Sequence, residues 1–560
     1  MKRPYRDISI GVIALMAFFL LLLENTFLGE SYRAVFRWAN LMVFVLFAGD
    51  VLLRFGASER KWDYVKRKWF DLIVFVPLIQ YVPAVQSDSL FVVIRQVVIV
   101  VMLISRSRRA RRLATLLSLE PGQAMVAGFL GAVGIGSVLL MLPLSTTVDH
   151  RCSLADAVFT ATSAVCVTGL SVQDTATYFS RFGQMVILTL IQAGGLGIMT
   201  FSVALVVFRR KQMDVRQRAA LQDALDYDAL AGVIRLVRFI VLMTLLFEAA
   251  GAIGLMWAWR GRFSSGAQTV YHAVFHSVSA FCNAGFSTFS DSLMSFRADT
   301  RTNVVICCLI VAGGLGFMVI LDVLTAFRAR LTGQRVWHKV RVQTKVVLWV
   351  TTVLIVGGSV LIYAAEEPNF LRVRPERGAV LSAVFQSVSA RTAGFNTVDM
   401  GKLSATTLLI TMVLMFIGAS PGSTAGGIKT TTLAVLWASV RNSLRNRPHI
   451  ELWRRTIPPE AVQKALMVLC LSLLLVCVFA GVLLHVEKKP FVDCLFETVS
   501  AFGTAGLSTG MTPQLSVVGK LLITVLMFVG RLGPLTMAYA LVGKRQVARY
   551  KYAEERLMIG

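Results

Sequence analysis

The sequence predicts an all-α polytopic membrane protein, with four helix–pore loop–helix repeats in a pseudo-fourfold arrangement and an N-terminal four-helix domain. Of its 560 residues, 56% are hydrophobic and only 16% are charged, and the mean hydropathy is +0.68. Apolar runs recur along nearly the whole chain, and one short motif occurs four times. These observations exclude soluble enzymes and nucleic-acid binders, because soluble chains are less apolar and more charged.

The excess of basic residues predicts the orientation in the membrane. The chain has 57 Lys and Arg against 31 Asp and Glu, a net charge of +26. Most of the Lys and Arg residues lie in the loops on the side of the N-terminus, and loops rich in Lys and Arg face the cytoplasm. We expect a multi-pass protein of the cell inner (plasma) membrane with both termini in the cytoplasm.

Residues 1–115 form the predicted N-terminal domain. The stretches around Asp50 and Asp71 resemble the second and third helices of voltage-sensor domains. Steps of three from Arg95 meet only aliphatic residues, whereas a sensor needs a ladder of arginines. We expect a voltage-sensor-like fold that serves as a structural or regulatory flank, with true voltage sensing as the alternative. Arginines between 106 and 112 are expected to bind membrane lipid headgroups. The apolar runs are about 8–28, 35–55, 69–83 and 89–105.

The remaining chain contains four copies of one motif, a Ser-Ala pair followed by a glycine. The copies recur about every 112 residues, which is the signature of a repeat architecture. They lie at 158–172, 274–288, 384–397 and 495–509, with glycines Gly169, Gly285, Gly394 and Gly506. The predicted repeats are 116–228, 229–340, 341–456 and 457–560.

Each repeat combines a long apolar span, a short amphipathic run, the motif and a second long span. The short run has about a dozen residues, too few to cross a bilayer that needs about twenty, so it is expected to be a re-entrant pore helix. Non-helical backbone at membrane depth survives only beside protein or a water-filled cavity, so four such loops are expected to surround one axis. The eight predicted spans are 122–143, 180–208, 233–258, 301–328, 343–365, 404–436, 462–485 and 516–543.

The four motif glycines are candidates for an ion selectivity filter. Cation filters use rings of backbone carbonyls, and residues that present them need unusual backbone angles, which glycine allows. Alternatively, each glycine could end its helix as a left-handed cap. The predicted filter consists of Val167, Thr168, Gly169 and Leu170; Asn283, Ala284, Gly285 and Phe286; Thr392, Ala393, Gly394 and Phe395; and Thr504, Ala505, Gly506 and Leu507.

Three further stretches stand out in the second spans. The segment from Gly418 to Gly427 contains Pro421 and polar residues, so a helix is expected to break there. The AGGLG stretches at 193–197 and 312–316 are expected to allow close helix packing, with a direct part in gating as the alternative. Arg531 lies at membrane depth, where a charge is expensive, and is expected to face a polar interior.

These motifs resemble the Ktr/Trk/HKT superfamily of potassium and sodium transporters, specifically its bacterial membrane subunits. The resemblance covers about 115–545 and rests on the four motifs, the AGGLG stretches, GASPGSTAGGIK at 418–429 and MFVGRLGP at 527–534. It implies a pseudo-fourfold pore, a homodimer and uptake of K⁺ or Na⁺. Glycine at all four filter positions goes with K⁺ in this family, so K⁺ is the expected permeant ion, bound only by the filter residues, without an organic cofactor.

The resemblance also assigns a gate and leaves its alternatives open. The family has an intramembrane gating loop at this place and an arginine under the filter as an electrostatic barrier. A static kink, and an arginine that only pairs with pore carbonyls, are the alternatives. The implied gate residues are Gly418, Pro421, Gly422, Ser423, Thr424, Gly426, Gly427, Lys429 and Arg531.

Three acidic residues, Asp174, Asp291 and Asp399, follow their filter glycines by five or six residues. Carboxylates at the outer mouth would raise the local cation concentration. The alternative is that they are solvated loop residues.

The sequence shows no nucleotide-binding pattern, so the resemblance implies a separate cytosolic Rossmann-type (RCK) regulatory subunit that docks on the basic loops 209–218, 328–345 and 441–455. A voltage-gated or Na⁺-conducting cation channel is the main alternative function. A membrane enzyme would need converging catalytic groups, which the sequence lacks, and no nucleic-acid partner is expected. The sequence does not separate a channel from an ion-coupled symporter.

Overall fold

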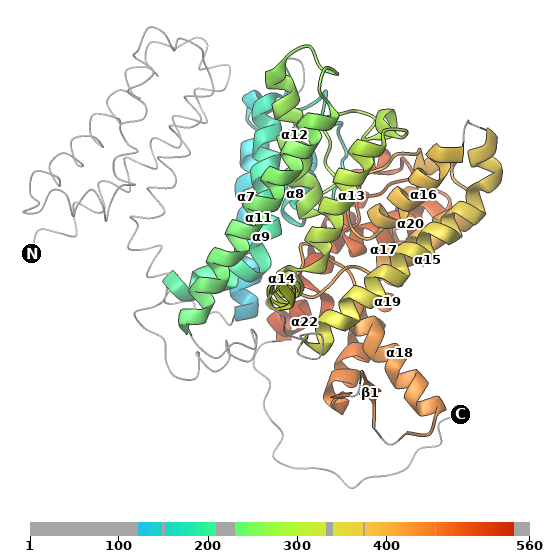
Figure 1. Cartoon of the computed structure of the whole chain (residues 1–560). Helices are drawn as coiled ribbons and strands as arrows, with labels where there is room; N and C mark the ends of the chain where they lie inside the picture. Colours follow the sequence, from blue (N-terminus) through green and yellow to red (C-terminus); the bar gives the residue numbers. More distant parts are fainter. Residues whose placement is uncertain are drawn as a thin grey trace, which may run out of the picture. The chain divides into compact units, whose positions relative to one another are not determined.

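The structure is a computed structural model, which describes residues 121–147, 152–208, 230–331, 340–372, 376–447, 449–453 and 455–542 (Figure 1). It divides into two units, Met1–Leu119 with Leu142–Leu144, and the rest of the chain. The predicted N-terminal domain, with Asp50, Asp71 and Arg95, lies outside the described residues.

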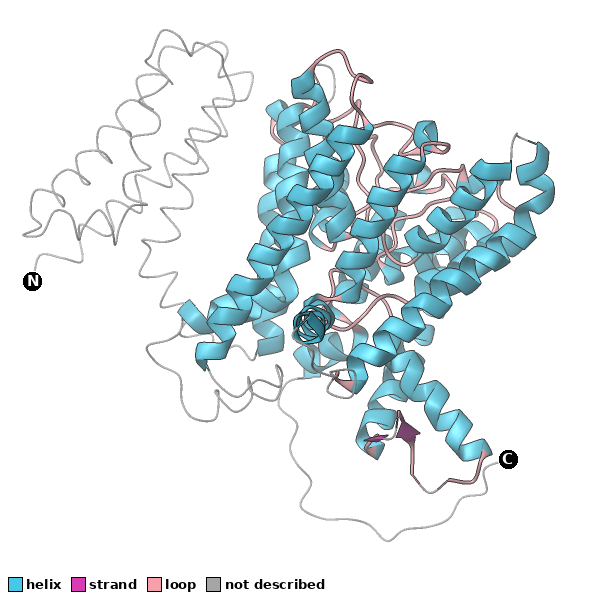
Figure 2. Cartoon of the chain, viewed as in Figure 1, coloured by secondary structure: helices cyan, strands magenta, loops and turns pink. Residues whose placement is uncertain are grey.

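The second unit is helical, which confirms the predicted all-α class. Figure 2 shows two short strands, β1 (Glu451–Leu452) and β2 (Arg455–Thr456), among helices and loops. The strands pair antiparallel, with Glu451 opposite Thr456.

Each repeat contains an outer helix, a short helix and an inner helix, in that order. The outer helices are α7 (Pro121–Leu140), α11 (Leu230–Ala258), α15 (Val342–Arg372) and α19 (Pro459–Glu487). The short helices are α8 (Leu154–Val165), α12 (Gly266–Cys282), α16 (Glu376–Ala390) and α20 (Phe491–Gly503). The inner helices are α9 (Arg181–Phe208), α13 (Thr300–Leu315), α17 (Ala405–Phe416) and α21 (Val517–Leu532), with α14 (Phe317–Leu331), α18 (Thr430–Leu444) and α22 (Pro534–Val542) following the last three. Short 3-10 helices are η3 (Pro143–Ser145), η4 (Met294–Phe296), η6 (Met400–Lys402) and η7 (Thr512–Gln514).

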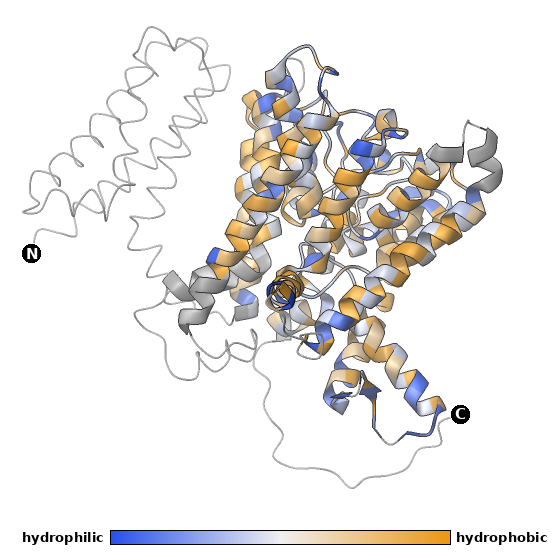
Figure 3. Cartoon of the chain, in the orientation of Figure 1, coloured by the Kyte–Doolittle hydropathy of each residue, from blue (hydrophilic) through white to orange (hydrophobic). Residues whose placement is uncertain are grey.

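Several helices are long and apolar enough to cross a membrane, as their hydropathy indicates (Figure 3). Within the described ranges there are four such helices, or six if two sharply bent pairs each count as one span. The other two predicted spans correspond to α9 and to α17 with α18, which a loop separates. These elements confirm a polytopic membrane protein.

Three of the four inner spans are interrupted, and for two of them, 301–328 and 516–543, the prediction of one continuous span is wrong. Helices α13 and α14 meet at 101°, and α21 and α22 meet at 95°. The bends occur at Gly316 and Gly533, whose φ angles are 80° and 86°. Such angles favour glycine because a Cβ would clash with the backbone. The third inner span is interrupted by residues 417–429, so the predicted break between Gly418 and Gly427 is confirmed.

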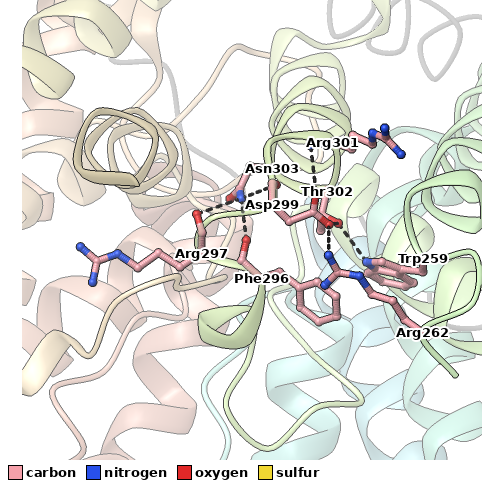
Figure 4. Close-up of polar contacts among 8 residues, drawn as sticks. All are labelled: Trp259, Arg262, Phe296, Arg297, Asp299, Arg301, Thr302 and Asn303. Carbon is pink, nitrogen blue, oxygen red and sulfur yellow. Dashed lines mark hydrogen bonds and ion pairs between the residues drawn. The ribbon is translucent and has the colours of Figure 1, made fainter. Parts of the chain in front are cut away.

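Polar side chains fix where the inner helices begin, as the start of α13 illustrates (Figure 4). Asp299 is its N-cap and accepts from the backbone N–H of Arg301 at 3.2 Å. The same carboxylate accepts from Thr302 Oγ1 at 2.8 Å and pairs with Arg262 at 3.3 Å. Trp259 Nε1 donates to Thr302 Oγ1 at 2.9 Å, so the end of the outer helix α11 is tied to this cap.

The four repeats close into a ring. Each inner helix packs on the short helix of the next repeat: α9 on α12, α13 on α16, α17 on α20, and α21 on α8. The last of these contacts includes an ion pair between Lys520 Nζ and Asp156 Oδ1 at 2.6 Å. The short helices therefore lie inside the ring, and most of their residues from the middle onward are buried. This closed order confirms the predicted pseudo-fourfold arrangement.

Candidate functional site at the centre of the four repeats

The candidate site is formed by four glycine loops, residues 167–170, 283–286, 392–395 and 504–507, which follow the four short helices. Each loop begins with a residue in left-handed conformation: Val167, Asn283, Thr392 and Thr504 have φ angles of 55°, 60°, 73° and 50°. The next residue donates its N–H to the carbonyl of the motif serine at 2.7–2.9 Å in all four copies. The left-handed residue thus stands two positions before each motif glycine, so the alternative that these glycines cap the helices is wrong.

The four motif glycines lie against one another in a closed ring. Their φ angles are 92°, 70°, 80° and 80° for Gly169, Gly285, Gly394 and Gly506. A Cβ on Gly169 would lie 2.4 Å from the carbonyl oxygen of Ala284, and one on Gly285 would lie 2.8 Å from that of Ala393. A Cβ on Gly394 would lie 2.9 Å from the oxygen of Ala505, and one on Gly506 would lie 2.1 Å from that of Thr168. Both the backbone angle and the space therefore require glycine.

The electrostatics of the ring favour a cation. All four short helices end at the glycine loops, and the C-terminal end of a helix carries a partial negative charge. Backbone carbonyls of the residues before the glycines add further negative dipoles beside the ring. An arrangement of this kind can replace the hydration shell of a cation.

A cavity of about 280 Å³ opens on the side of the residues that follow the glycines, and all four glycines line it. Of the three predicted outer-mouth carboxylates, Asp174 lines this cavity, whereas Asp291 and Asp399 do not. Asp291 accepts from the N–H of Ser295 at 2.8 Å. Asp399 accepts from the N–H of Gly401 at 3.1 Å and pairs with Lys402 at 3.1 Å. These two carboxylates stabilise local turns, as Asp174 also does by accepting from the N–H of Ala176 at 3.0 Å.

The loop 417–429 lies on the other side of the ring and is held by two other repeats. The N–H of Ser420 donates to the carbonyl of Gly314 at 3.1 Å, in the inner helix of the second repeat. The N–H of Gly426 donates to Thr504 Oγ1 at 3.1 Å, in the fourth glycine loop. Gly422 and Gly427 have φ angles of 74° and 66°. The loop therefore passes directly beside the glycine ring.

Arg531 is 3% exposed and touches this loop. Its Nη1 donates to the carbonyl of Thr424, and its Nη2 donates to the carbonyl of Gly194 at 2.8 Å. A second cation, Lys429, donates from Nζ to the carbonyl of Ala425 at 2.6 Å. Two positive charges are thus associated with the loop, and the hydrogen bonds of each go to backbone carbonyls.

The AGGLG glycines pack closely, as predicted. A Cβ on Gly194 would lie 2.0 Å from the carbonyl oxygen of Val165, and one on Gly313 would lie 1.9 Å from that of Phe281. These glycines therefore let the inner helices approach the ends of the short helices.

Sequence reasoning missed the role of the motif serines. Ser163 Oγ accepts from the N–H of Gly169 at 3.1 Å, and Ser279 Oγ donates to the carbonyl of Phe286 at 2.8 Å. Ser389 Oγ likewise donates to the carbonyl of Phe395. The recurrence of serine in all four motifs was the signal that could have predicted these contacts.

Comparison with known proteins adds the following findings. Residues 98–546 match the TrkH family, described as a cation transport protein. The chain is 40% identical over 448 residues to Ktr system potassium uptake protein B of Bacillus subtilis, covering 79% of this chain and 97% of that one. It is 38% identical over 451 residues to the potassium/sodium uptake protein NtpJ of Enterococcus hirae, covering 79% and 98%. The fold is similar to the crystal structure of the potassium transporter TrkH from Vibrio parahaemolyticus, with a TM-score of 0.60, 18% identity, and coverage of 95% and 98%.

Proposed function

We propose, on the premise that this chain belongs to the TrkH family of cation transport proteins, that K⁺ crosses the membrane through the ring of four glycine loops. The chain is a potassium uptake transporter of the Ktr/Trk type. The observation that carries the finer proposal is the closed ring, in which each glycine lies against the next loop.

The proposed filter acts through backbone carbonyls. The sixteen residues of the four glycine loops supply them, and the ends of the short helices add negative potential. A side chain at any of the four glycines would meet a neighbouring carbonyl within 2.9 Å. Glycine at all four positions, which the superfamily resemblance associates with K⁺, supports K⁺ as the preferred ion.

Loop 417–429 is the proposed gate, with Arg531 and Lys429 as its charges. A cation that leaves the ring on this side would meet the loop and two positive groups, which raise its energy. Hydrogen bonds hold the loop to the second and fourth repeats, and it lies between α17 and α18, so it can move without unfolding a helix. Asp174, which lines the opposite cavity, would concentrate cations at the outer mouth.

We further propose a homodimer, a cytosolic Rossmann-type (RCK) regulatory subunit that docks on basic cytoplasmic loops, and the domain boundaries predicted above. One relative is named as a component of a Ktr system, which supports the existence of partner components. The predicted loops 328–345 and 441–455 include Arg341, Arg441, Arg445 and Arg447, which supports contact with an acidic surface or with lipid headgroups.

A second candidate function is Na⁺ conduction, because a relative at 38% identity is named a potassium/sodium uptake protein. Flux of each ion into liposomes that contain the purified protein separates the two candidates. Gly169→Ser should lower the K⁺/Na⁺ permeability ratio by at least about tenfold, since a side chain there meets the carbonyl of Ala284. Gly357→Ala, in the open interior of α15, is the control and should leave the ratio unchanged. An unaltered ratio in folded Gly169→Ser would refute the proposed filter.

A further inference from the structure

One further position of the repeat lies behind the glycine loops. It stands three residues before each motif serine, so it occupies the same face of the short helix one turn earlier. Its side chains differ in chemistry, yet all are buried, at 0–1% exposure. The four residues are Thr160, His276, Gln386 and Glu497.

In the fourth repeat this residue is Glu497, and its side chain holds Ser508 and Thr512, which follow Gly506. Ser508 Oγ donates to Glu497 Oε1, and Thr512 Oγ1 donates to Oε2 at 2.8 Å. Ser508 is two residues after Gly506, and both residues line the cavity next to the ring. The carboxylate thus links the short helix to the outer end of the glycine loop.

In the second repeat a histidine makes the equivalent link. His276 Nε2 lies 3.0 Å from Ser287 Oγ, and Ser287 is two residues after Gly285. Nδ1 is 2.8 Å from the carbonyl of His272, so it is the donor, and Nε2 of the neutral ring accepts from Ser287, whose hydroxyl also lies 3.3 Å from the carbonyl of Ser292. The ring stacks on Phe289 at 4.6 Å, which fixes its orientation.

The other two repeats lack this link. Gln386 donates to the sulfur of Met400, and the hydroxyl of Thr160 has no partner in the part of the chain that the structure describes. The linked loops belong to the second and fourth repeats, which stand opposite each other in the ring.

We propose that Glu497 and His276 are positioning residues for ion selectivity, which hold the outer ends of two opposite filter loops and so fix the spacing of the carbonyl ring. This inference rests on the proposed filter. A ring whose loops relax inward would also fit a smaller ion, so loss of either link should favour Na⁺ relative to K⁺.

The second and fourth glycine loops differ in the other hydrogen bonds that hold them. The second loop is also held by Ser279, whose hydroxyl donates to the carbonyl of Phe286. In the fourth repeat, the hydroxyl of Ser500 has no partner among the described residues. The fourth loop therefore depends more on Glu497 than the second depends on His276.

The test measures the K⁺/Na⁺ permeability ratio of the full chain in liposomes. Glu497→Ala should lower the ratio by at least about tenfold, the scale of a lost charge-assisted hydrogen bond. Glu497→Gln keeps an acceptor for Ser508 and a polar group for Thr512, so it should stay within about threefold of the unmodified chain. His276→Ala should have a smaller effect than Glu497→Ala. Thr160→Val, at the matching position without a hydrogen bond, should change nothing.

Ser508→Ala removes the link from the loop side and leaves the short helix intact, so it should also lower the ratio even where Glu497→Ala fails to fold. Gly506→Ser, measured alongside, tests the filter itself. If Gly506→Ser lowers the K⁺/Na⁺ ratio while Ser508→Ala and Glu497→Ala both leave it unchanged, the positioning role is overturned and the filter still stands. No shift in any of them overturns the filter. Equal losses in Glu497→Gln and Glu497→Ala would contradict the hydrogen-bond explanation.

Discussion

Individual residues at the centre of the ring have roles that follow from their backbone contacts. The motif glycines combine a positive φ with neighbours that leave no room for a Cβ. Arg531 joins the loop 417–429 to the inner helix of the first repeat through two carbonyls. Its charge has no carboxylate partner among the ion pairs of the described residues, so its positive potential acts on the proposed pathway.

Arg531→Gln should raise K⁺ flux and leave the K⁺/Na⁺ ratio unchanged. If the guanidinium lies about 10 Å from the path at an effective dielectric of about 20, it costs a passing cation about 1.7 kcal/mol, which corresponds to more than a tenfold change in rate. Liposome flux measures the change, and Arg301→Gln, at the start of α13, is the control. Flux at or below that of the unmodified chain would argue for a purely structural arginine.

At the scale of elements, the inner helices show how one repeat can take different local forms. Three of the four are interrupted near the same place, by a bend at Gly316, by loop 417–429 and by a bend at Gly533, whereas α9 continues from Arg181 to Phe208. Glycine or proline stands at each interruption, but Gly197, which matches Gly316 in the AGGLG stretch, lies inside α9, so glycine alone does not produce a bend. The loop is the longest of the three and is the one that reaches the glycine ring.

Gly316→Ala should destabilise the protein by about 1–3 kcal/mol, because φ of 80° with ψ of 146° is accessible almost only to glycine. A Cβ there would also lie 3.0 Å from the backbone of Gly422. The apparent Tm in detergent reports the change. Gly357→Ala, inside α15 with nothing within 4 Å of its Cβ, should leave the Tm unchanged or raise it. Equal Tm values for the two variants would show that a side chain at position 316 does not strain the bend between α13 and α14.

Deletion of residues 420–425 should raise K⁺ flux without altering the K⁺/Na⁺ ratio. The deleted residues include Ser420 and Thr424, whose N–H groups hold the loop to the second repeat. The deletion leaves the four glycine loops intact. Flux is compared with the unmodified chain at equal protein content, and an unchanged or lower flux in folded protein would favour a static kink over a gate.

At the scale of the whole second unit, the order of packing makes the ring. Each inner helix contacts the short helix of the next repeat, and the fourth returns to the first. This last junction joins residues 364 positions apart and contains the ion pair of Lys520 with Asp156, whose side chains are 14% and 10% exposed. The ion pair therefore joins the fourth repeat to the first, which do not follow each other in the chain.

Lys520→Met should destabilise the protein by about 3–5 kcal/mol, because it leaves Asp156 buried without its counter-charge. The matched control is Lys402→Met, which removes an exposed partner of Asp399 and should cost at most about 1 kcal/mol. Thermal unfolding in detergent compares the two. Similar losses in both variants would show that the junction does not need the ion pair.

The sequence alone determined the membrane class, the four repeats, the glycine motifs and the break in the third inner helix. These features are properties of the linear chain, since apolar run length, recurrence of a motif, and glycine with proline in a helix can be read without knowing any neighbour. The superfamily resemblance was confirmed for the same reason, because it rested on local motifs.

Only the tertiary structure decided which residues meet. It separated Asp174, which lines the cavity at the ring, from Asp291 and Asp399, although all three stand at similar distances from their glycines. It paired Arg531 with the carbonyl of Gly194 across 337 residues. Such contacts depend on how helices from different repeats pack, and packing also sets the backbone angles at Gly316 and Gly533 that bend the inner helices. A linear pattern specifies which residues share a helix face, but the packing of all four repeats into a ring decides which other helix that face contacts.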